Sequence, residues 1–447
     1  MTRSATRPDS VLIVSFSYWP AQNARSFRWT ALAEDWASQG MRVDVVCAWV
    51  PGSAETETVG GVRVHRVGMR AVERLRAALA RSRHGGPAQE AAGKNVQSLG
   101  SRAKRAAGRA IAAAWQQLYW PDTACLWYFP ALRKARELQR AAASDAVISV
   151  SPEFTAVAVG HALAGSRPRN SAWLIDLGDP FSFLSEAPPN NTRLYAGLNR
   201  RFERRCLARA SAVTVTNDAT QDRYRELFPE SASKLHVVPP LLTLDAPADS
   251  KPATDGPVRL VYLGRLYRTI RRPDFLLALF AVLAQGGGAD CELHFYGDAS
   301  ECADSFVPYA ALLGRRIHLH GTIPRSRVAD AMREATVLVN ISNTTDYQLP
   351  SKIVEYAASG KPILNIAATR ADCSARFLAG YPMHLTLQAG DGAPSADDRE
   401  QLLELLSRAR QPVDAAALSA WLDRYRLPTV SASYLRILAE IMAGETA

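Results

Sequence analysis

The chain has 447 residues, more than one packed core usually holds, so two domains are expected. Hydrophobic residues make up 47% of the chain and charged residues 21%, which excludes a disordered or fibrous protein. The formal net charge is +10, and no apolar run approaches the roughly 20 residues that a membrane-spanning helix needs.

The cysteines and the first ten residues indicate the cellular compartment in which the protein is expected. The six cysteines are scattered, with no CxxC pair and no flanking histidine at metal-binding spacing, so a reducing compartment is expected and no metal site is predicted. Residues Met1 to Ser10 are polar and run directly into an apolar strand, unlike a signal peptide. We therefore expect a cytoplasmic protein.

The first elements along the chain read strand, loop, helix, strand. An apolar strand at 11–14 is followed by a polar loop, a periodic helix at 30–40 that Gly40 closes, and a strand at 41–50. Further strand-like runs, separated by helical patterns, lie at 146–151, 171–177, 211–217 and 235–240. This alternation predicts an open parallel α/β sheet in a first domain at 1–245.

The stretch DAPADSKPATDGP at 245–257 has no periodicity and is the best linker in the sequence. After it, strand-like runs that are apolar on both faces lie at 258–264, 291–297, 316–321, 336–342 and 361–367, with helices from Pro273, Ser326 and Pro350. We predict a second doubly wound domain at 258–427 and a C-terminal helix at 428–447 that returns to the first domain. Ligands of such folds usually bind at the carboxyl ends of the strands, so we expect the site in a cleft between the two sheets.

The stretch LPSKIVEYAASGKPIL at 349–364 is the most specific motif, with Pro350 in the first turn of a helix and Gly360 at its end. It resembles the retaining glycosyltransferases of family 4. The opening VLIVSFSYWP with FRWTALAEDWASQGMRVDVV, the stretch at 261–277 and HLHGTIPRSRVADAMREATVLV at 318–339 are similar to the same family, in the expected order. The resemblance implies the GT-B fold, in which two Rossmann-like domains face one another, and a role in bacterial surface polysaccharide.

Glu355 on this helix corresponds by position to a family residue that binds the donor ribose, and a carboxylate can accept hydrogen bonds from two vicinal hydroxyls. The alternative is an exposed first-turn residue that interacts with the helix dipole and with Lys352. The family usually has a pair of Glu residues whose first member would stand at the position of Tyr347, so the contact to the donor sugar is different or missing here. The backbone N–H groups of Ser351 and Lys352 are expected to face the diphosphate.

Two arginines follow the strand that ends at Gly264. The resemblance assigns Arg265 and Arg271 to the donor diphosphate, where cations stabilise the charge that builds on the leaving group. Alternatively the cluster is a solvated basic loop, or Arg268 or Arg272 takes the second role.

The turn from Gly321 to Ile323 follows a strand and precedes a helix. In the family this turn packs against the nucleotide base and reads it through backbone groups. A plain strand-to-helix turn is the alternative.

The loop at 20–28 in the first domain is expected to approach the diphosphate and the acceptor. It carries Asn23, Ala24, Arg25 and Ser26 where many family members have a Gly pair, so its turn must be built differently. Arg28 matches an arginine of some bacterial members. The alternative for Arg28 is a surface residue.

Two carboxylates are candidates for orienting or deprotonating the acceptor hydroxyl. Asp179 lies in LIDLGDPFSF, which resembles the family's Asp-x-x-Asp-Pro segment, and Glu153 follows the strand at 146–151. Asp179 could instead cap local N–H groups in a turn. The Asp-x-Asp signature of the metal-dependent glycosyltransferase fold is absent from the sequence, so activity without a metal or other cofactor is expected.

Together these features predict a glycosyltransferase that moves a sugar from a nucleotide-diphosphate donor to an acceptor hydroxyl with retention of configuration. A UDP-sugar is our guess for the donor, and a lipid-linked or saccharide acceptor is expected. The alternatives are a sugar-nucleotide epimerase of the same fold and a catalytically silent assembly partner. No nucleic acid partner is expected, because no recognition motif accompanies the basic charge.

The segment at 69–140 has 14 Lys or Arg against four acidic residues and so carries the whole net charge. Its basic residues are interleaved with aromatic ones such as Trp115, Tyr119 and Trp120, a mixture typical of helices that lie on membranes. We therefore expect docking to an anionic membrane surface, at the inner face of the cell membrane. The alternative is a solvated insertion whose aromatics belong to the core.

Overall fold

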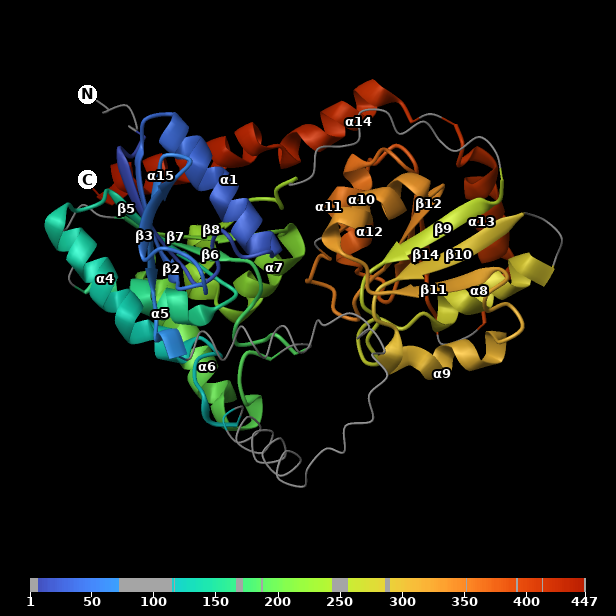
Figure 1. Cartoon of the computed structure of the whole chain (residues 1–447), viewed down its shortest axis with the longest axis horizontal. Helices are drawn as coiled ribbons and strands as arrows, with labels where there is room; N and C mark the ends of the chain where they lie inside the picture. The colour runs from blue at the N-terminus through green and yellow to red at the C-terminus, as the bar shows by residue number, and fades with distance from the viewer. Residues whose placement is uncertain are drawn as a thin grey trace. The chain divides into compact units, whose positions relative to one another are not determined.

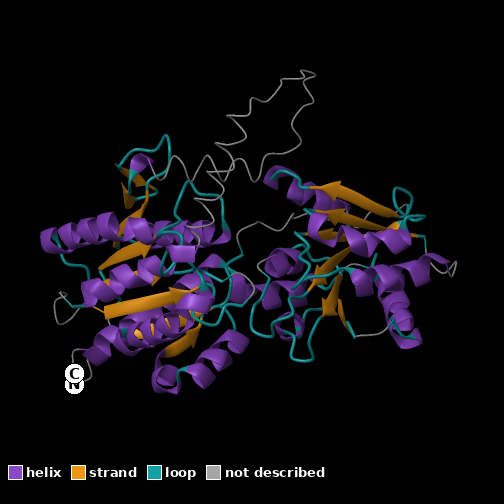
Figure 2. Ribbon diagram, turned by 90° about the horizontal axis from the view of Figure 1, so that it is seen from below, coloured by secondary structure: helices purple, strands orange, loops and turns teal. Residues whose placement is uncertain are grey.

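The computed structural model describes residues 7–71, 115, 117–165, 172–185, 188–242, 256–285, 290–350, 352–390, 393–411 and 413–445. It divides into two compact units (Figure 1). Unit 1 comprises Met1–Thr216, Gln221–Val238 and Ser431–Ala447, and unit 2 comprises Asn217–Thr220 and Pro239–Val430. Each unit is a sheet with helices on both of its faces (Figure 2).

Unit 1 has an eight-stranded sheet in the order β3-β4-β2-β1-β5-β6-β7-β8, parallel except for β3, which pairs antiparallel with β4. The strands are β1 (Ser10–Ser15), β2 (Arg42–Ala48), β3 (Thr56–Val59), β4 (Val62–Val67), β5 (Ala146–Val150), β6 (Ala172–Leu177), β7 (Ala212–Val215) and β8 (Leu235–Val237). Its helices include α1 (Ala24–Ser38), α4 (Tyr128–Ala141), α5 (Phe154–Ala164), α6 (Thr192–Arg209) and the part of α15 (Leu427–Glu445) from Ser431.

The core of unit 1 explains the apolar strands of the sequence. Every residue of β1, β5 and β6 is buried, as expected for parallel strands that helices cover on both faces. Because β1 pairs with both β2 and β5, it is central, and the loops that follow β1 and β5 leave from the same edge of the sheet.

Unit 2 has a six-stranded parallel sheet in the order β11-β10-β9-β12-β13-β14. Helices α10, α11 and α12 lie on one side of it, and α8 and α13 on the other (Figure 1). From β9 the chain runs outward to β11, and it starts again at β12 on the other side of β9. The point where this order reverses, between β9 and β12, is where such folds bind ligands at the carboxyl ends of the strands. The strands are β9 (Val258–Leu263), β10 (Cys291–Tyr296), β11 (Ile317–Gly321), β12 (Val337–Ile341), β13 (Ile363–Ala367) and β14 (His384–Gln388), and the helices include α8 (Asp274–Gln285), α9 (Ala303–Phe306), α10 (Arg325–Glu334), α11 (Lys352–Ala358), α12 (Cys373–Leu378), α13 (Ala396–Arg408) and α14 (Ala415–Leu422).

The predicted fold class, two doubly wound parallel sheets, is confirmed. One local expectation is wrong: the predicted loop at 20–28 ends early, because α1 begins at Ala24 rather than at Thr30. Asn23 caps this helix, and its side chain accepts a hydrogen bond from the backbone of Ser26 (2.9 Å). Arg25 and Arg28 therefore lie on the helix and not in a loop.

Most of the predicted membrane-docking segment, residues 72–114 and 116, lies outside the described residues. Of its aromatics, Tyr119 is buried, and Trp120 donates a hydrogen bond to the Asn199 side chain (2.9 Å), so both belong to the packing of unit 1. Trp115 is exposed. None of the described helices is long and apolar enough to cross a membrane.

Candidate functional site

In unit 2, the loops that follow β9 and β12 meet where the strand order reverses. The guanidinium of Arg271 donates a hydrogen bond to the Asn343 side chain (2.6 Å), and the Thr344 N–H donates to the carbonyl of Ile270 (3.1 Å). These contacts fix the two loops against each other. Arg271 is thereby held at the place where doubly wound sheets bind ligands.

Two predicted glycines, Gly264 and Gly321, and a third that was not predicted, Gly297, lie where the loops after β9, β10 and β11 stack closely. Gly264 donates its N–H to the carbonyl of Tyr296 (2.8 Å), and Gly297 donates to the carbonyl of Gly321 (2.8 Å). Gly297 has φ +138°, and a Cβ there would lie 1.9 Å from the Gly264 carbonyl oxygen, so other residues are excluded. Ile323 follows these loops half-buried and packs against the core of unit 2.

Three of the four arginines after β9 are paired with carboxylates. Each of these arginine side chains is more than a third exposed, so the ion pairs are screened by water and weak. The pairs are Arg265 with Asp298 (3.5 Å) and Glu301 (2.8 Å), Arg268 with Asp304 (3.5 Å), and Arg272 with Asp274 (2.6 Å) and Asp304 (3.5 Å).

Arg271 differs from these three. Among the described residues no carboxylate lies within ion-pairing distance of it, its partner Asn343 is neutral, and its Nε is buried without a hydrogen-bond partner. Burial raises the pKa of Tyr262, and the adjacent Arg271 acts against that rise. The positive charge of Arg271 is thus the least compensated of the four.

Glu355 and Lys352 lie half-buried on α11, which is tied to the end of β9. The Tyr356 hydroxyl accepts a hydrogen bond from the N–H of Leu263 (2.9 Å) and donates one to its carbonyl (3.1 Å). This pair of bonds places the turn that carries Glu355 beside the strand that leads to Gly264. Tyr347 is buried, and Ser351 lies outside the described residues.

Unit 1 has its own charged cluster, centred on Asp176 near the end of β6. Asp176 is buried, and its Oδ2 forms an ion pair with Arg25 and accepts from Trp29 Nε1 (3.0 Å). Its Oδ1 accepts from Thr214 Oγ1 (2.7 Å) and from the Tyr434 hydroxyl (2.7 Å). Both oxygens are therefore fully used inside unit 1.

The charge of Asp176 is stabilised from several sides. Burial alone would raise the pKa of Asp176, but the Arg25 and Arg28 guanidinium groups and the hydrogen bonds outweigh it, and the pKa lies below its usual value. Arg28 is itself buried, and donates to the Tyr434 hydroxyl (2.9 Å) and to the carbonyl of Val238 (3.2 Å). The structure thus uses Arg28 inside unit 1 and not as a surface residue.

Arg25 connects this cluster to the carboxyl edge of the sheet. Its Nε donates to the carbonyl of Ser151 (2.9 Å), in the loop after β5. A Cβ at Gly178 would lie 2.7 Å from the Arg25 guanidinium carbon, so a glycine there leaves room for the arginine. Glu153 in the loop after β5 and Asp179 in the loop after β6 are both half-buried at this same edge.

Two family models match the chain. A "Glycosyl transferase 4-like domain" matches residues 26–240, and "Glycosyl transferases group 1" matches residues 257–381. The chain belongs to the GT-B glycosyltransferases. Among curated proteins no significant sequence match was found.

Solved structures of similar fold include several glycosyltransferases. The catalytic domain of starch synthase IV from Arabidopsis thaliana, bound to ADP and acarbose, has a TM-score of 0.58 at 8% identity and covers 98% of this chain and 100% of its own. The lipopolysaccharide outer core galactosyltransferase WaaB has 0.56 at 12%, covering 96% and 98%. Anabaena HepE, in complex with UDP-glucose, has 0.52 at 14%, covering 96% and 99%. At these identities the likeness confirms the predicted GT-B fold.

Two buried residues of unit 1 that are hydrogen-bonded to each other, Asp176 and Tyr434, were not predicted from the sequence. Asp176 lies three positions before Asp179, and a carboxylate inside the apolar run AWLIDL was a signal that it has a partner. Tyr434 is 258 residues away from Asp176, and nothing local indicates the contact.

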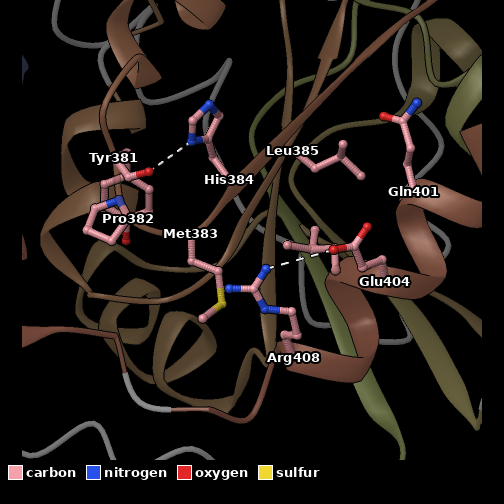
Figure 3. Close-up of a pocket in the computed structure, with 9 residues that line it drawn as sticks. Tyr381, Pro382, Met383, His384, Leu385, Gln401, Glu404 and Arg408 are labelled. Carbon is pink, nitrogen blue, oxygen red and sulfur yellow. Dashed lines mark hydrogen bonds and ion pairs between the residues drawn. The ribbon is translucent and has the colours of Figure 1, made fainter.

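A separate cavity of about 280 Å³ lies in unit 2 next to the edge strand β14 (Figure 3). It is lined by residues of β14 and α13, among them His384, Glu404 and Arg408. His384 Nδ1 faces the carbonyl of Tyr381 (2.9 Å), and Arg408 lies 3.9 Å from Glu404. No predicted site residue lines this cavity.

Proposed function

We propose that this glycosyltransferase transfers a sugar from a nucleotide-diphosphate donor to an acceptor hydroxyl, with retention of anomeric configuration. The observation that carries the donor assignment is Arg271, a cation held by Asn343 at the strand-order reversal of unit 2 and without a carboxylate partner among the described residues. An anion bound there gains more from Arg271 than from an arginine already paired.

In this proposal Arg271 and Arg265 hold the donor diphosphate. Arg265 exchanges its exposed partners Asp298 and Glu301 for phosphate oxygens, at small cost because those pairs are screened by water. Negative charge grows on the diphosphate as the glycosidic bond breaks, so both guanidinium groups stabilise the transition state more than the ground state. No metal or other cofactor is invoked.

The remaining donor contacts follow the arrangement of unit 2. Glu355, placed beside the end of β9, accepts hydrogen bonds from the ribose hydroxyls. The loop from Gly321 to Ile323 packs against the base. Proteins of similar fold have been solved with UDP-glucose and with ADP, so the fold alone does not determine which nucleotide base is bound. We propose a UDP-sugar as the donor.

Retention follows in the proposal from attack on the same face from which the diphosphate leaves. The acceptor hydroxyl forms the new bond to the anomeric carbon as the bond to the diphosphate breaks, and a diphosphate oxygen takes the hydroxyl proton. Asp179 or Glu153 orients the acceptor from the carboxyl edge of unit 1. The NMR coupling constant of the anomeric proton in the product tests retention.

The proposed pathway is bacterial surface polysaccharide, with a lipid-linked or saccharide acceptor, in a cytoplasmic enzyme that is peripheral on the membrane. The likeness to WaaB and the charge of residues 69–140 support it. We expect the protein to co-sediment with anionic but not with neutral vesicles at low salt, because each cation near anionic lipid contributes about 1 kcal/mol. Equal recovery with both kinds of vesicle would remove the membrane role.

The decisive experiment is a thermal-shift survey with UDP, GDP, dTDP and ADP on three proteins. One nucleotide is expected to raise Tm of the wild type and of Arg272→Gln, whose arginine is already paired with Asp274, but not of Arg271→Gln. An equal shift in Arg271→Gln would show that the diphosphate binds elsewhere. Turnover of the sugar nucleotide without any acceptor would favour the epimerase, and binding without turnover the silent assembly partner.

A further inference from the structure

Three histidines and a glutamate gather on one face of the sheet of unit 2. Glu292 and His294 lie two residues apart on β10, and His318 and His320 two apart on β11. The strands are parallel, with His294 and His318 as register partners. Since residues two apart point to the same face of a strand, the four side chains share the face opposite to the core residues of β10.

The side chains are close enough to share one ion. Ligand atoms of Glu292, His294 and His318 all lie within 4.8 Å of one another, and His294 Nε2 is 3.1 Å from Glu292 Oε2. Tetrahedral zinc with bonds of about 2.0 to 2.2 Å places neighbouring ligand atoms about 3.3 to 3.6 Å apart. The three groups therefore need to move by only about 1 Å to surround an ion.

His318 adds an independent indication. Its Nε2 is buried and has no hydrogen-bond partner among the described residues, although its ring stacks against His294 at a centroid distance of 4.6 Å. A buried ring nitrogen without a partner loses its hydrogen bond to water and gains none in return. A metal ion bound by this nitrogen removes that deficit.

His320 is placed to orient His294. Its Nε2 lies 2.9 Å from His294 Nδ1, and its ring stacks on Tyr296 at 4.1 Å. When His294 Nδ1–H donates to His320, His294 Nε2 is left as the ligand atom.

One neighbouring charge opposes metal binding. The Arg259 guanidinium lies 3.7 Å from Glu292 and also 3.7 Å from Glu334 on α10. Because Arg259 is shared between two carboxylates and is 41% exposed, it can stay with Glu334 when Glu292 turns to an ion.

We propose that Glu292, His294 and His318 bind a divalent transition metal, with Zn²⁺ as the ion that two imidazoles and one carboxylate fit best. Water completes the coordination. The ion joins the edge strand β11 to β10. This site is independent of the proposed sugar transfer, because none of its ligands is assigned to the donor or the acceptor.

The test is isothermal titration of ZnCl₂ into the full-length protein after treatment with EDTA and desalting. The wild type is expected to bind one equivalent, and Glu292→Gln and His318→Ala to lose it. His320→Phe should weaken binding roughly 10- to 100-fold, the usual effect of removing a residue that orients a ligand. His384→Asn is the matched control, since its Nδ1 faces a backbone carbonyl away from the cluster.

Co²⁺ gives a second readout, because a tetrahedral nitrogen and oxygen site produces intense visible absorption bands that should disappear in Glu292→Gln. Circular dichroism without metal checks that each variant is folded. If His318→Ala is unfolded, Glu292→Gln and His294→Asn decide. Absence of a zinc equivalent in the wild type, or equal zinc binding in Glu292→Gln and His384→Asn, would overturn the proposal.

Discussion

The two units place arginines at the carboxyl ends of their sheets but use them differently. In unit 1, the half-buried Arg25 forms an ion pair with Asp176, and the buried Arg28 lies near the same carboxylate and donates to the Tyr434 hydroxyl. In unit 2, Arg271 is held by the neutral amide of Asn343 and keeps its charge available. The same architecture thus contains one cluster centred on a buried carboxylate and one in which we propose that a cation binds an anionic ligand.

Replacing Asp176 is expected to have the largest effect on stability, and it tests the role of the charged cluster in unit 1. Asp176→Asn keeps the volume but leaves the buried Arg28 and the half-buried Arg25 without their counter-charge, so the free energy of unfolding is expected to fall by about 3 to 5 kcal/mol in urea denaturation. The control is Glu230→Gln, which removes an exposed partner of Arg204 and should cost less than about 1 kcal/mol. Equal losses of unfolding free energy in both variants would show that the Asp176 cluster stabilises the fold no more than an exposed ion pair does.

The lowered pKa of Asp176 makes its contribution to the free energy of unfolding depend on pH. Because its pKa is lower in the folded protein, Asp176 stabilises the fold at pH values above its unfolded pKa of about 4, and this contribution is lost as the pH falls further. The difference in unfolding free energy between wild type and Asp176→Asn should therefore shrink on acidification. A constant difference from pH 7 to about pH 3 would contradict the assignment.

Arg271→Gln tests whether Arg271 of unit 2 acts on the bound donor and not on the stability of the fold. Loss of a cation that acts on the leaving group is expected to lower kcat by about 100- to 1000-fold while Tm changes little, since no ion pair among the described residues is broken. Steady-state kinetics with the nucleotide sugar found in the thermal-shift survey measures the effect. A normal kcat with reduced stability would make Arg271 a structural residue like Arg28.

Glu355→Gln is expected to have a smaller effect. The amide retains the volume but weakens charge-assisted hydrogen bonds of roughly 1.5 to 3 kcal/mol each, so nucleotide affinity should fall at least about tenfold in calorimetry. Glu400→Gln, an exposed residue of α13, is the matched control. Unchanged affinity in a folded Glu355→Gln protein would show that the ribose assignment is wrong.

Excess EDTA is expected to have no effect on sugar transfer. The diphosphate assignment rests on Arg265 and Arg271, and it includes no metal ligand. Initial rates with and without EDTA provide the measurement. If chelation abolishes turnover and magnesium restores it, the arginines are not the counter-charge for the diphosphate.

The sequence predicted the central strands of both sheets well because each is a short apolar run between polar turns that is buried on both faces. The edge strand β14 was not predicted. The antiparallel pair of β3 and β4 was not predicted, although Gly60 and Gly61 mark its turn with positive φ. The start of α1 was also missed, since it depends on the Asn23 cap.

Side-chain partnerships were the harder part. The histidine cluster depends on the register of two strands, and His294 and His320 are 26 residues apart, so a search for closely spaced ligands did not find it. The individual arginines of the 265–272 loop could not be ranked from sequence either. Their ranking depends on Asp298, Glu301 and Asp304, which follow β10, as far as α9, and do not belong to the 265–272 loop.

The bond from Tyr434 to Asp176 also bears on how the protein is made. Unit 1 begins at the N-terminus, yet its buried carboxylate receives a hydroxyl from the last helix, and Trp36 donates to Ser431 of the same helix (2.9 Å). Domains usually fold in the order in which the ribosome releases them. Here the first unit to emerge cannot complete its interior until α15 has left the exit tunnel, so unit 1 stays unfinished throughout the synthesis of unit 2.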